Sequence, residues 1–548
     1  MAMVTTRRMA RWAAVGVALA GCSEPVRFVA DAGGGGGGLD VGPVVRDTGV
    51  VPRVDTGVAT DRGAVRTVRD FLLPGTVDDA PTRFGGAETE EGAPTLVYPD
   101  DRTIIPPNLP LFEVHFRPGA GNDLFAVSFA GDVSEARFFT RCSRVNDGCV
   151  LTLNAGQMTE IARASAGSSG VRITVRGTAV GESGGAVRRS ASRFLGVTQS
   201  ELRGGVYWWV SSGSIARYDF GRADARAESF LRGDPINCVG CHALSRDGQR
   251  IAAGRFIPAP APTSILNVQT RARIGNEFGN NFGTFSPDNT RFLASDGMRM
   301  TLLDATTATP TMGLAAGTAG SMPDWSPNGN AVVFSRPQQM VPIPTGSPGH
   351  GAPADLFLMD WNGSAFGAPR MLAPSMGRNF YYPSYSPDGQ WIVFNVSSGN
   401  SYDAPDASLY VVRADGTGQP VRLTSADGAV LGNSWPKWTP FVERYVGELE
   451  EPLMWVTFTS RRDYGLRIQQ QNRERGEQRA QLWMAAFRPG VSGADPSAPG
   501  FWVPFQNLNE GNHIAQWVEE IRRQDCGDAG TCGPGEICQN GRCIGPPP

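Results

Sequence analysis

Three stretches of the chain repeat one plan: F-G-T-F-S-P-D-N-T-R-F-L-A-S (282–295), M-P-D-W-S-P-N-G-N-A-V-V-F-S (322–335) and Y-P-S-Y-S-P-D-G-Q-W-I-V-F-N (382–395). C-H-A-L-S-R-D-G-Q-R-I-A-A-G (241–254) is a fourth copy, and a degenerate fifth copy runs from 435 to 460. In the first four, an aromatic or apolar residue precedes Ser, a tight turn follows, and a β-rich strand comes next. Asp or Asn followed by Gly predicts a two-residue hairpin turn, because both residue types tolerate positive φ.

The turns recur at spacings of 41, 40 and 60 residues, from Asp247 through Asp288 and Asn328 to Asp388. Such periods are typical of a propeller or another repeat array. The copies resemble the repeats of TolB-like six-bladed β-propellers, which carry the same S-P-D-G turn, and the region that resembles them is 200–524. A right-handed solenoid is the alternative.

Six blades need one more sheet than the five visible copies provide. The sixth would combine 205–220 with the late strand 501–505, so that both ends of the repeat region close the ring. A closed ring leaves no open sheet edge.

Short alternating strands precede the repeats. Residues 111–116 (L-F-E-V-H-F) place Phe112, Val114 and Phe116 on one face, and 124–129 and 171–176 alternate in the same way. About seven such strands over 94–180 resemble an immunoglobulin-like or fibronectin-like β-sandwich. The expected fold class is therefore all-β, with an N-terminal sandwich followed by a six-bladed propeller.

Three residues of this region carry further predictions. His115 alternates with the apolar set of its strand, so it is expected to point to solvent. Cys142 and Cys149 are close enough in sequence to form a disulfide across a hairpin in an oxidising compartment.

The first 21 residues are typical of a signal peptide, with three arginines before a short apolar run that ends in L-A-G-C. They look like a bacterial lipoprotein signal, which implies a lipid on Cys22. Because Ser23 is not acidic, an outer-membrane lipoprotein of the cell envelope is favoured. An ordinary secretory signal followed by a chance cysteine is the alternative. Residues 22–93 include six consecutive glycines and predict a disordered tether.

The last segment, 525–548, has almost no apolar content and holds four cysteines. Two disulfides, with three possible pairings, are expected to keep it compact, and a zinc knuckle is the competitor. With its own disulfides, the tail is expected to be independent of the ring. It weakly resembles extracellular adhesion or cell-wall-facing modules. The cysteines are Cys526, Cys532, Cys538 and Cys543.

Composition excludes some function classes. The chain of 548 residues has a formal net charge of −3, and loss of the signal, with its three arginines and no acid, takes the charge to −6. Lys437 is the one lysine in the sequence. A nucleic-acid partner is therefore not expected. No stretch after residue 21 is apolar for 18 residues, so no spanning helix is predicted.

One motif indicates a cofactor. C-V-G-C-H (238–242) resembles the attachment site of c-type haem, which implies thioether bonds from Cys238 and Cys241 and iron ligation by His242. A short-loop disulfide, with His242 as a turn residue, is the alternative. His513 is the favoured sixth ligand because ring closure brings the late chain beside the first repeat; His115, His350 or a methionine are the others.

Function follows from these patterns. G-E-S-G-G (181–185) matches G-x-S-x-G, but no strand-to-helix elbow surrounds Ser183, so an enzyme is not favoured. Resemblance to TolB-like propellers implies a non-enzymatic binding platform for envelope proteins or glycans. The alternative is a periplasmic electron-transfer protein that uses haem c.

Overall fold

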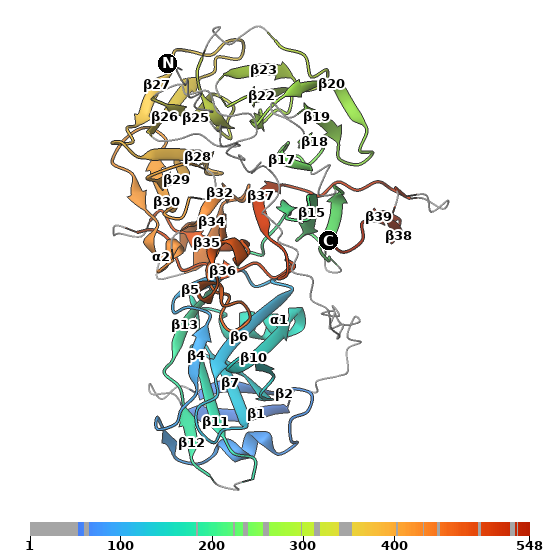
Figure 1. Cartoon of the computed structure of the whole chain (residues 1–548). Helices are drawn as coiled ribbons and strands as arrows, with labels where there is room; N and C mark the ends of the chain where they lie inside the picture. Colours follow the sequence, from blue (N-terminus) through green and yellow to red (C-terminus); the bar gives the residue numbers. More distant parts are fainter. Residues whose placement is uncertain are drawn as a thin grey trace, which may run out of the picture.

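The computed structural model is all-β and has two bodies, a ring and a smaller sandwich beside it (Figure 1). No helix in the part of the chain that it describes is long and apolar enough to cross a membrane. The described residues are 53–59, 65–181, 185–222, 225–233, 239–255, 262–297, 299–311, 318–338, 353–401, 404–430, 432–446, 450–490, 495–526, 532–533 and 535–548. The signal peptide, Cys22, Ser183, Cys238 and His350 lie outside them, so their predicted roles stay predictions.

The ring is a β-propeller, and its described strands form six blades (Figure 1). From the innermost strand outward, blade 1 is β37 (Asn512–Val518), β14 (Gly205–Val210), β15 (Ser214–Asp219) and β16 (Glu228–Leu231). Blade 2 is β17 (Val239–Leu244), β18 (Arg250–Arg255), β19 (Pro262–Asn267) and β20 (Arg273–Gly279), and blade 3 is β21 (Phe282–Phe285), β22 (Arg291–Ser295) and β23 (Met300–Asp304).

The other three blades follow the same plan. Blade 4 is β24 (Ser321–Trp325), β25 (Ala331–Pro337), β26 (Ala354–Asp360) and β27 (Arg370–Ala373). Blade 5 is β28 (Asn379–Tyr385), β29 (Trp391–Ser397), β30 (Ser408–Arg413) and β31 (Val421–Arg422). Blade 6 is β32 (Ser434–Trp438), β34 (Glu450–Ser460), β35 (Gln481–Phe487) and β36 (Phe501–Trp502), with β33 (Glu443–Val446) added to β34.

The six innermost strands contact one another in sequence around the ring, which confirms the predicted propeller. Closure differs from the prediction in one strand. Strand β37 pairs antiparallel with β14, with Val206 opposite Trp517, whereas β36 pairs with β35 inside blade 6. The apolar run 501–505 was the clearer strand in the sequence, but the innermost strand of a blade borders the channel and accepts polar residues such as Gln516.

The repeated turns are four-residue loops and not the predicted two-residue turns. The amide of Ser386 donates to the Trp391 carbonyl, and the Ser386 hydroxyl accepts from the Trp391 amide at 2.9 Å. The same hydroxyl donates to Asp388 at 2.5 Å. Gly389 takes a φ of 71°, which glycine adopts without strain. Equivalent bonds close the turns at Ser245, Ser286 and Ser326. The S-x-D-G signature is thus a side-chain-bridged loop.

The smaller body is a sandwich of two sheets with helix α1 (Ala155–Ala164) packed at one end. Rings of Phe116 and Phe125, one from each sheet, lie 4.9 Å apart in its core. One sheet contains β1 (Arg53–Ala59), β2 (Val65–Leu72), β8 (Ser134–Arg141), β7 (Leu124–Ala130), β11 (Gly170–Thr178), β12 (Val187–Arg189), β3 (Glu88–Thr89), β13 (Arg193–Val197) and β5 (Thr103–Ile105). The other contains β4 (Thr95–Tyr98), β6 (Leu111–Arg117), β10 (Gly148–Asn154) and β9 (Arg144–Val145).

The sandwich is larger than the predicted range 94–180. The prediction of an unstructured tether through residue 93 is wrong for its second half, because β1, β2, the 3-10 turn η1 (Ala80–Phe84) and β3 lie there. Strand β2 pairs in parallel with β8 and carries the buried Asp70, which forms an ion pair with Arg137 at 2.6 Å. The glycine run dominates the composition of the whole segment and hid this strand.

All three predicted disulfide units are present. Cys142 and Cys149 are bonded, as expected. In the tail, Cys526 is bonded to Cys538 and Cys532 to Cys543. Cys538 and Cys543 lie opposite each other in a hairpin of β38 (Ile537–Gln539) and β39 (Arg542–Ile544).

The tail is not independent of the ring, contrary to the expectation from its disulfides. The Pro546 carbonyl accepts from the Ser229 amide at 2.7 Å, and the Gly545 amide donates to Glu228 at 2.6 Å. The last residues therefore cover the outer strand β16 of blade 1, and Figure 1 shows the C-terminus near β15 of the same blade.

Candidate functional site

The central channel of the propeller is built from one recurring position of the innermost strands. This position lies four residues before the turn Ser, or before Thr439 and Val518 in the two blades without that Ser. Its side chains line one cavity, and we call this set the channel ring: Phe282, Met322, Tyr382, Trp435 and Ile514. Cys241 occupies the sixth equivalent position, and its side chain lies outside the described part.

Backbone irregularities hold the channel ring in place. Strands β24, β28 and β32 each have a shift of register at this level, and so does the pairing of β37 with β14. Met322, Tyr382, Trp435 and Ile514 have φ of 56°, 50°, 55° and 56°. A residue other than glycine in this region costs about 1–3 kcal/mol, and such residues cluster at functional sites.

The sequence contained a signal for the channel ring that the turn motif obscured. At the position four residues before the turn Ser, every copy has a large apolar residue or cysteine. In three copies the next residue is proline: Pro323, Pro383 and Pro436. Because proline has no N–H for the strand ladder, it is found in sheets mainly at edges and bulges.

Aromatic packing narrows the channel. Tyr382 and Trp435 are stacked with ring centroids 3.7 Å apart, and Phe282 lies 5.9 and 6.2 Å from them. The Met322 sulfur accepts from the Tyr382 amide at 3.4 Å. The cavity that remains has a volume of about 60 Å³.

His242 lies beside this cavity and is buried. It is only 4% exposed, and its ring nitrogens have almost no accessible surface and no hydrogen bond of normal geometry from a described residue. Burial lowers its pKa to about 4, although the nearby Tyr207 backbone opposes that shift. The imidazole is therefore neutral at neutral pH, with one nitrogen able to donate and the other to accept a bond or bind a metal.

Lys437 separates this cavity from a second one of about 140 Å³ on the side of the S-P-D-G turns, and it lines both. Its ammonium group lies 3.1 Å from Asp324, whose other oxygen accepts from the Tyr385 amide at 2.8 Å. Because Asp324 belongs to blade 4, Tyr385 to blade 5 and Lys437 to blade 6, this ion pair links three blades across the channel.

The haem motif is described only in part. The backbone of Cys241 and all of His242 belong to β17, but Cys238 and the Cys241 side chain are outside the described part. The neutral imidazole fits an axial iron ligand. The cavity of about 60 Å³ does not fit a porphyrin, since pockets for ligands of that size class hold about 300–1,000 Å³. His513 lies on β37 with its ring 5.6 Å from Trp209 and does not line the cavity beside His242.

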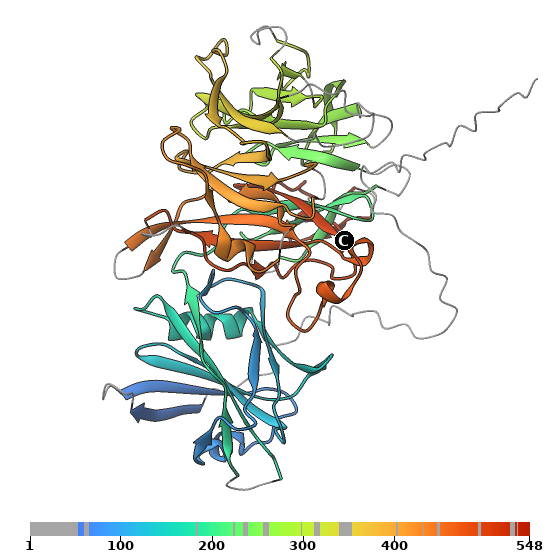
Figure 2. The ribbon, with the colours of Figure 1, turned by 60° about the vertical axis from the view of Figure 1, so that its left-hand side comes forward.

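A second buried polar cluster joins the sandwich to the propeller. Glu113 accepts from the Tyr464 hydroxyl at 2.7 Å and from Arg467 at 2.7 and 2.6 Å. His115 Nε2 lies 2.9 Å from Glu113, and its Nδ1 accepts from the Leu466 amide at 3.1 Å. Figures 1 and 2 both show the sandwich against the edge of the ring near blade 6.

The expected solvent-facing position of His115 is therefore wrong. The side chain is fully buried, because the propeller loop between β34 and β35 covers the second face of β6. Burial lowers the pKa of His115 and outweighs its bond to Glu113. Burial opposes ionisation of Glu113 too, but its bonds to His115 and Arg467 hold its pKa at about 2. All these groups are partnered, so the cluster has a structural role.

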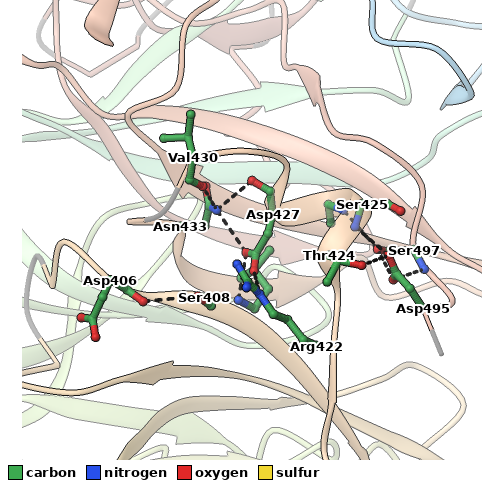
Figure 3. A network of polar contacts seen from close by, with 12 residues as sticks. Asp406, Ser408, Arg422, Thr424, Ser425, Asp427, Val430, Asn433, Asp495 and Ser497 are labelled. Carbon is green, nitrogen blue, oxygen red and sulfur yellow. Dashed lines mark hydrogen bonds and ion pairs between the residues drawn. The ribbon is translucent and has the colours of Figure 1, made fainter.

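The polar network of Figure 3 also connects blades. Asp427 of helix α2 (Thr424–Asp427) accepts from Arg422 at 2.7 Å and from Asn433 at 3.1 Å, and its carbonyl accepts from Arg462 at 3.0 Å. Burial raises the pKa of Asp427, and the bond to Arg422 opposes that rise. Asp495 binds the amide of Ser425 at 2.6 Å. Because Arg462 and Asp495 of blade 6 bind residues of helix α2, which follows the last strand of blade 5, the network connects blade 5 to blade 6.

Metal-binding clusters are scarce. Within the described ranges, the one group of three or more His, Cys, Asp or Glu side chains close enough to share an ion is Cys526, Cys532 and Cys543. These sulfurs are in disulfides, so the predicted disulfide role accounts for them.

No protein-family model and no curated protein matches the chain. Among solved structures, it is similar to a putative TolB from Agrobacterium tumefaciens at 17% identity, over 58% of this chain and 99% of that chain, with a TM-score of 0.33. It is similar to TolB from Acinetobacter baumannii at 14% identity, over 64% of this chain and 80% of that chain, with a TM-score of 0.38. It is also similar to a chain of a nidogen–laminin complex at 8% identity, over 58% of this chain and 99% of that chain, with a TM-score of 0.35. At these values the likeness carries no argument about activity, and the propeller assignment rests on strand pairing.

Proposed function

We propose that this chain is a non-enzymatic binding protein of the bacterial cell envelope, whose propeller recognises an envelope protein or a glycan at its central channel. The observation that carries this proposal is the left-handed φ of Met322, Tyr382, Trp435 and Ile514. The same strained conformation recurs at one level around the channel. Retention of such strain is expected at a recognition surface, where it fixes the direction of side chains.

The polar groups of the channel favour binding over catalysis. Asp324 is engaged by Lys437 and by the Tyr385 amide. His242 has no hydrogen-bonded acid or nucleophile beside it in the described part of the chain. General acid–base and nucleophilic catalysis require such groups within hydrogen-bond reach of each other.

Site-specific photocrosslinking tests the binding role. A benzophenone amino acid at Phe282 places the reactive group in the channel, and the same group at Met371, which is 52% exposed on β27, is the matched control. In cells, we expect a discrete crosslinked product from position 282 and none from position 371. The same products from both positions, or none from 282, would count against the channel as a recognition site.

The proposal includes an anchor, a lipid on Cys22. Replacement of Cys22 by Ser is expected to move the protein from the membrane fraction to the soluble fraction and to abolish labelling with a fatty-acid probe. A Cys22→Ser protein that stays in the membrane fraction would contradict lipidation there, without bearing on the channel.

A second candidate function is electron transfer through a c-type haem on Cys238 and Cys241, and the neutral imidazole of His242 favours it. His242 would hold the iron, and the haem would supply one-electron chemistry. The cavity that the described residues form beside His242 holds about 60 Å³, which is smaller than a porphyrin needs. A Soret band that survives acid-acetone extraction of the purified protein would establish the haem, and a colourless protein would refute it.

A further inference from the structure

The cavity of about 140 Å³ on the turn side is the mouth of the channel, and a second set of equivalent positions lines it. These positions lie two residues after the channel ring in each blade, and we call them the polar tier. The polar tier is Ala243, Thr284, Asp324, Ser384, Lys437 and Gln516. All six blades thus contribute a residue to the mouth, and five of these residues are polar.

A rigid rim surrounds the mouth. In blades 2 to 6, the residue that follows the turn Ser, or Thr439, lines the same cavity. One of these residues is Arg246, which pairs with Glu519 at 2.7 Å and donates to the Pro440 carbonyl at 2.9 Å. The other four are prolines, which have a fixed φ and no N–H. They are Pro287, Pro327, Pro387 and Pro440. The rim therefore offers apolar contact in a fixed shape.

The mouth is blocked at its inner end. Lys437 separates it from the cavity beside His242, which holds only about 60 Å³, the volume of about two water molecules. The stacked rings of Tyr382 and Trp435 narrow the channel there. A polymer cannot thread through this space, so only the end of a chain can enter. The mouth itself has room for one group of about the size of benzene, which a cavity of about 150 Å³ holds.

Lys437 has unused hydrogen-bond donors at this inner end. An ammonium group has three N–H donors, and its one partner among the described residues is Asp324 at 3.1 Å. The Lys437 side chain lines the mouth and is 25% exposed. Because Asp324 is itself held by the Tyr385 amide at 2.8 Å, the ammonium is positioned before a ligand arrives.

We propose that the mouth binds the free C-terminus of a partner polypeptide, with the terminal carboxylate on the Lys437 ammonium and the last amide N–H on Asp324. A C-terminus has an anion close to an N–H donor, which matches an ammonium and a carboxylate 3.1 Å apart. Hydrogen bonds between an ammonium and a carboxylate are charge-assisted and about twice as strong as neutral ones. The inference rests on the proposed binding function and names the chemistry of its partner.

The lining favours a peptide terminus over the acidic end of a glycan. A sugar has several hydroxyl groups, and each needs a hydrogen-bond partner when it is buried. Four of the five rim residues are prolines, whose side chains provide none. A terminal amino acid brings one carboxylate, one N–H and a side chain that can be apolar. The side-chain amide of Gln516 adds a donor and an acceptor for the last peptide group.

NMR of the full mature protein labelled with ¹³C-lysine tests the site, because Lys437 is the one lysine and gives one Hε–Cε signal. The probes are pools of N-acetylated tetrapeptides with a free C-terminus, one pool for each terminal residue. One matched set has an amidated C-terminus, and another has a free N-terminus and an amidated C-terminus. We expect at least one free-acid pool to shift the Lys437 signal saturably, and both amidated sets to leave it unchanged.

Fluorescence anisotropy with the free-acid pool that binds, labelled at its N-terminus, measures the role of the ammonium. We expect Lys437→Gln to weaken binding by more than about tenfold, and Lys437→Arg, which keeps the charge, to keep part of the affinity. Arg273→Gln removes an exposed cation that pairs with Glu277 on the outer strand of blade 2, and it should bind as the parent protein does.

Equal shifts from free-acid and amidated pools, a shift only from peptides with a free N-terminus, or no shift from any pool would overturn the inference. Full affinity in Lys437→Gln would overturn it as well. The NMR readout uses the parent protein, so it decides the question even if Lys437→Gln does not fold. A crosslink from position 282 without peptide binding at Lys437 would refute this inference and leave the proposed binding function in place. A saturable shift without that crosslink would support the inference and count against the channel ring as the contact surface.

Discussion

Gly465 sets how closely the propeller loop approaches the sandwich. Its φ is +49°, and a Cβ built there would lie 2.0 Å from His115 Nδ1. An alanine must displace the loop and break the bond from Leu466 to His115. We expect Gly465→Ala to lower the free energy of unfolding by about 2–4 kcal/mol in urea titrations, because buried polar groups lose their partners. Gly418→Ala, with a φ of +79° and open space around it, should cost only about 1 kcal/mol. Equal losses in both variants would contradict this contact.

At the residue scale, the sequence predicts whether a side chain is buried when that burial depends only on the residue's own strand. Alternation in 111–116 placed Phe112, Val114 and Phe116 in the sandwich core, and all three are buried. It failed for His115, because the residue that covers it, Leu466, lies 351 positions later in the chain. A pattern within one strand contains no information about a contact that another domain makes.

At the scale of elements, the contact of β6 with the β34–β35 loop makes stability depend on pH. The groups that face His115 are Glu113 on its own strand, Tyr98, and Tyr464 and Arg467 from the loop. The folded pKa of His115 lies below the ordinary 6.5, so the unfolded chain takes up the proton first. The stability that this group contributes is therefore complete above pH 6.5 and falls as the pH drops.

His242 acts in the same direction, because burial lowers its pKa from 6.5 to about 4. We expect the urea midpoint of the parent protein to fall between pH 7.5 and 5.5. His115→Gln and His242→Gln should each remove part of that fall, and the double variant should be nearly flat. A double variant with the slope of the parent protein would show that other groups control it. Glu113, with a pKa of about 2 against 4.5, adds a loss only below pH 4.5.

The tail and the outer strand of blade 1 form another pair of elements with a testable contact. A chain that ends at Pro546 keeps both bonds to β16, whereas a chain that ends at Ile544 loses the partners of the Ser229 amide and of Glu228. Glu228 is fully buried and also forms ion pairs with Arg217 and Arg523. We expect the shorter chain to lose about 1–3 kcal/mol in urea unfolding and the longer one to match the parent. Identical urea midpoints for the two truncated chains would show that the contact of the tail with β16 does not stabilise the ring.

For the whole molecule, the repeats predicted the ring because each S-x-D-G copy specifies its own turn and strand. The turn Ser, the Asp or Asn that its hydroxyl contacts and the following strand are local in sequence, and they recur in blades 2 to 5. The channel site was not predicted: the sequence singled out His242 as a haem ligand, and the other channel residues differ in type from blade to blade. What they share is a position and a backbone conformation, and a motif of fixed letters detects neither.

The closing strand gives the last prediction. Without β37, strand β14 becomes an exposed edge, its buried residues Val206 and Trp208 lose their cover, and β32 and β17 lose a neighbour on the channel. A chain that ends at Gly511 should therefore unfold over a broad range of urea and expose the β14 amides to rapid hydrogen exchange. The amides of β25 in blade 4, on the other side of the ring, are the internal reference and should lose protection less. Because the tail is missing as well, the chain that ends at Ile544 is the matched control, and it should keep β14 protected. Equal protection of β14 in both truncated chains would mean that a ring without β37 folds as well as the complete ring, and that closure by β37 does not stabilise it.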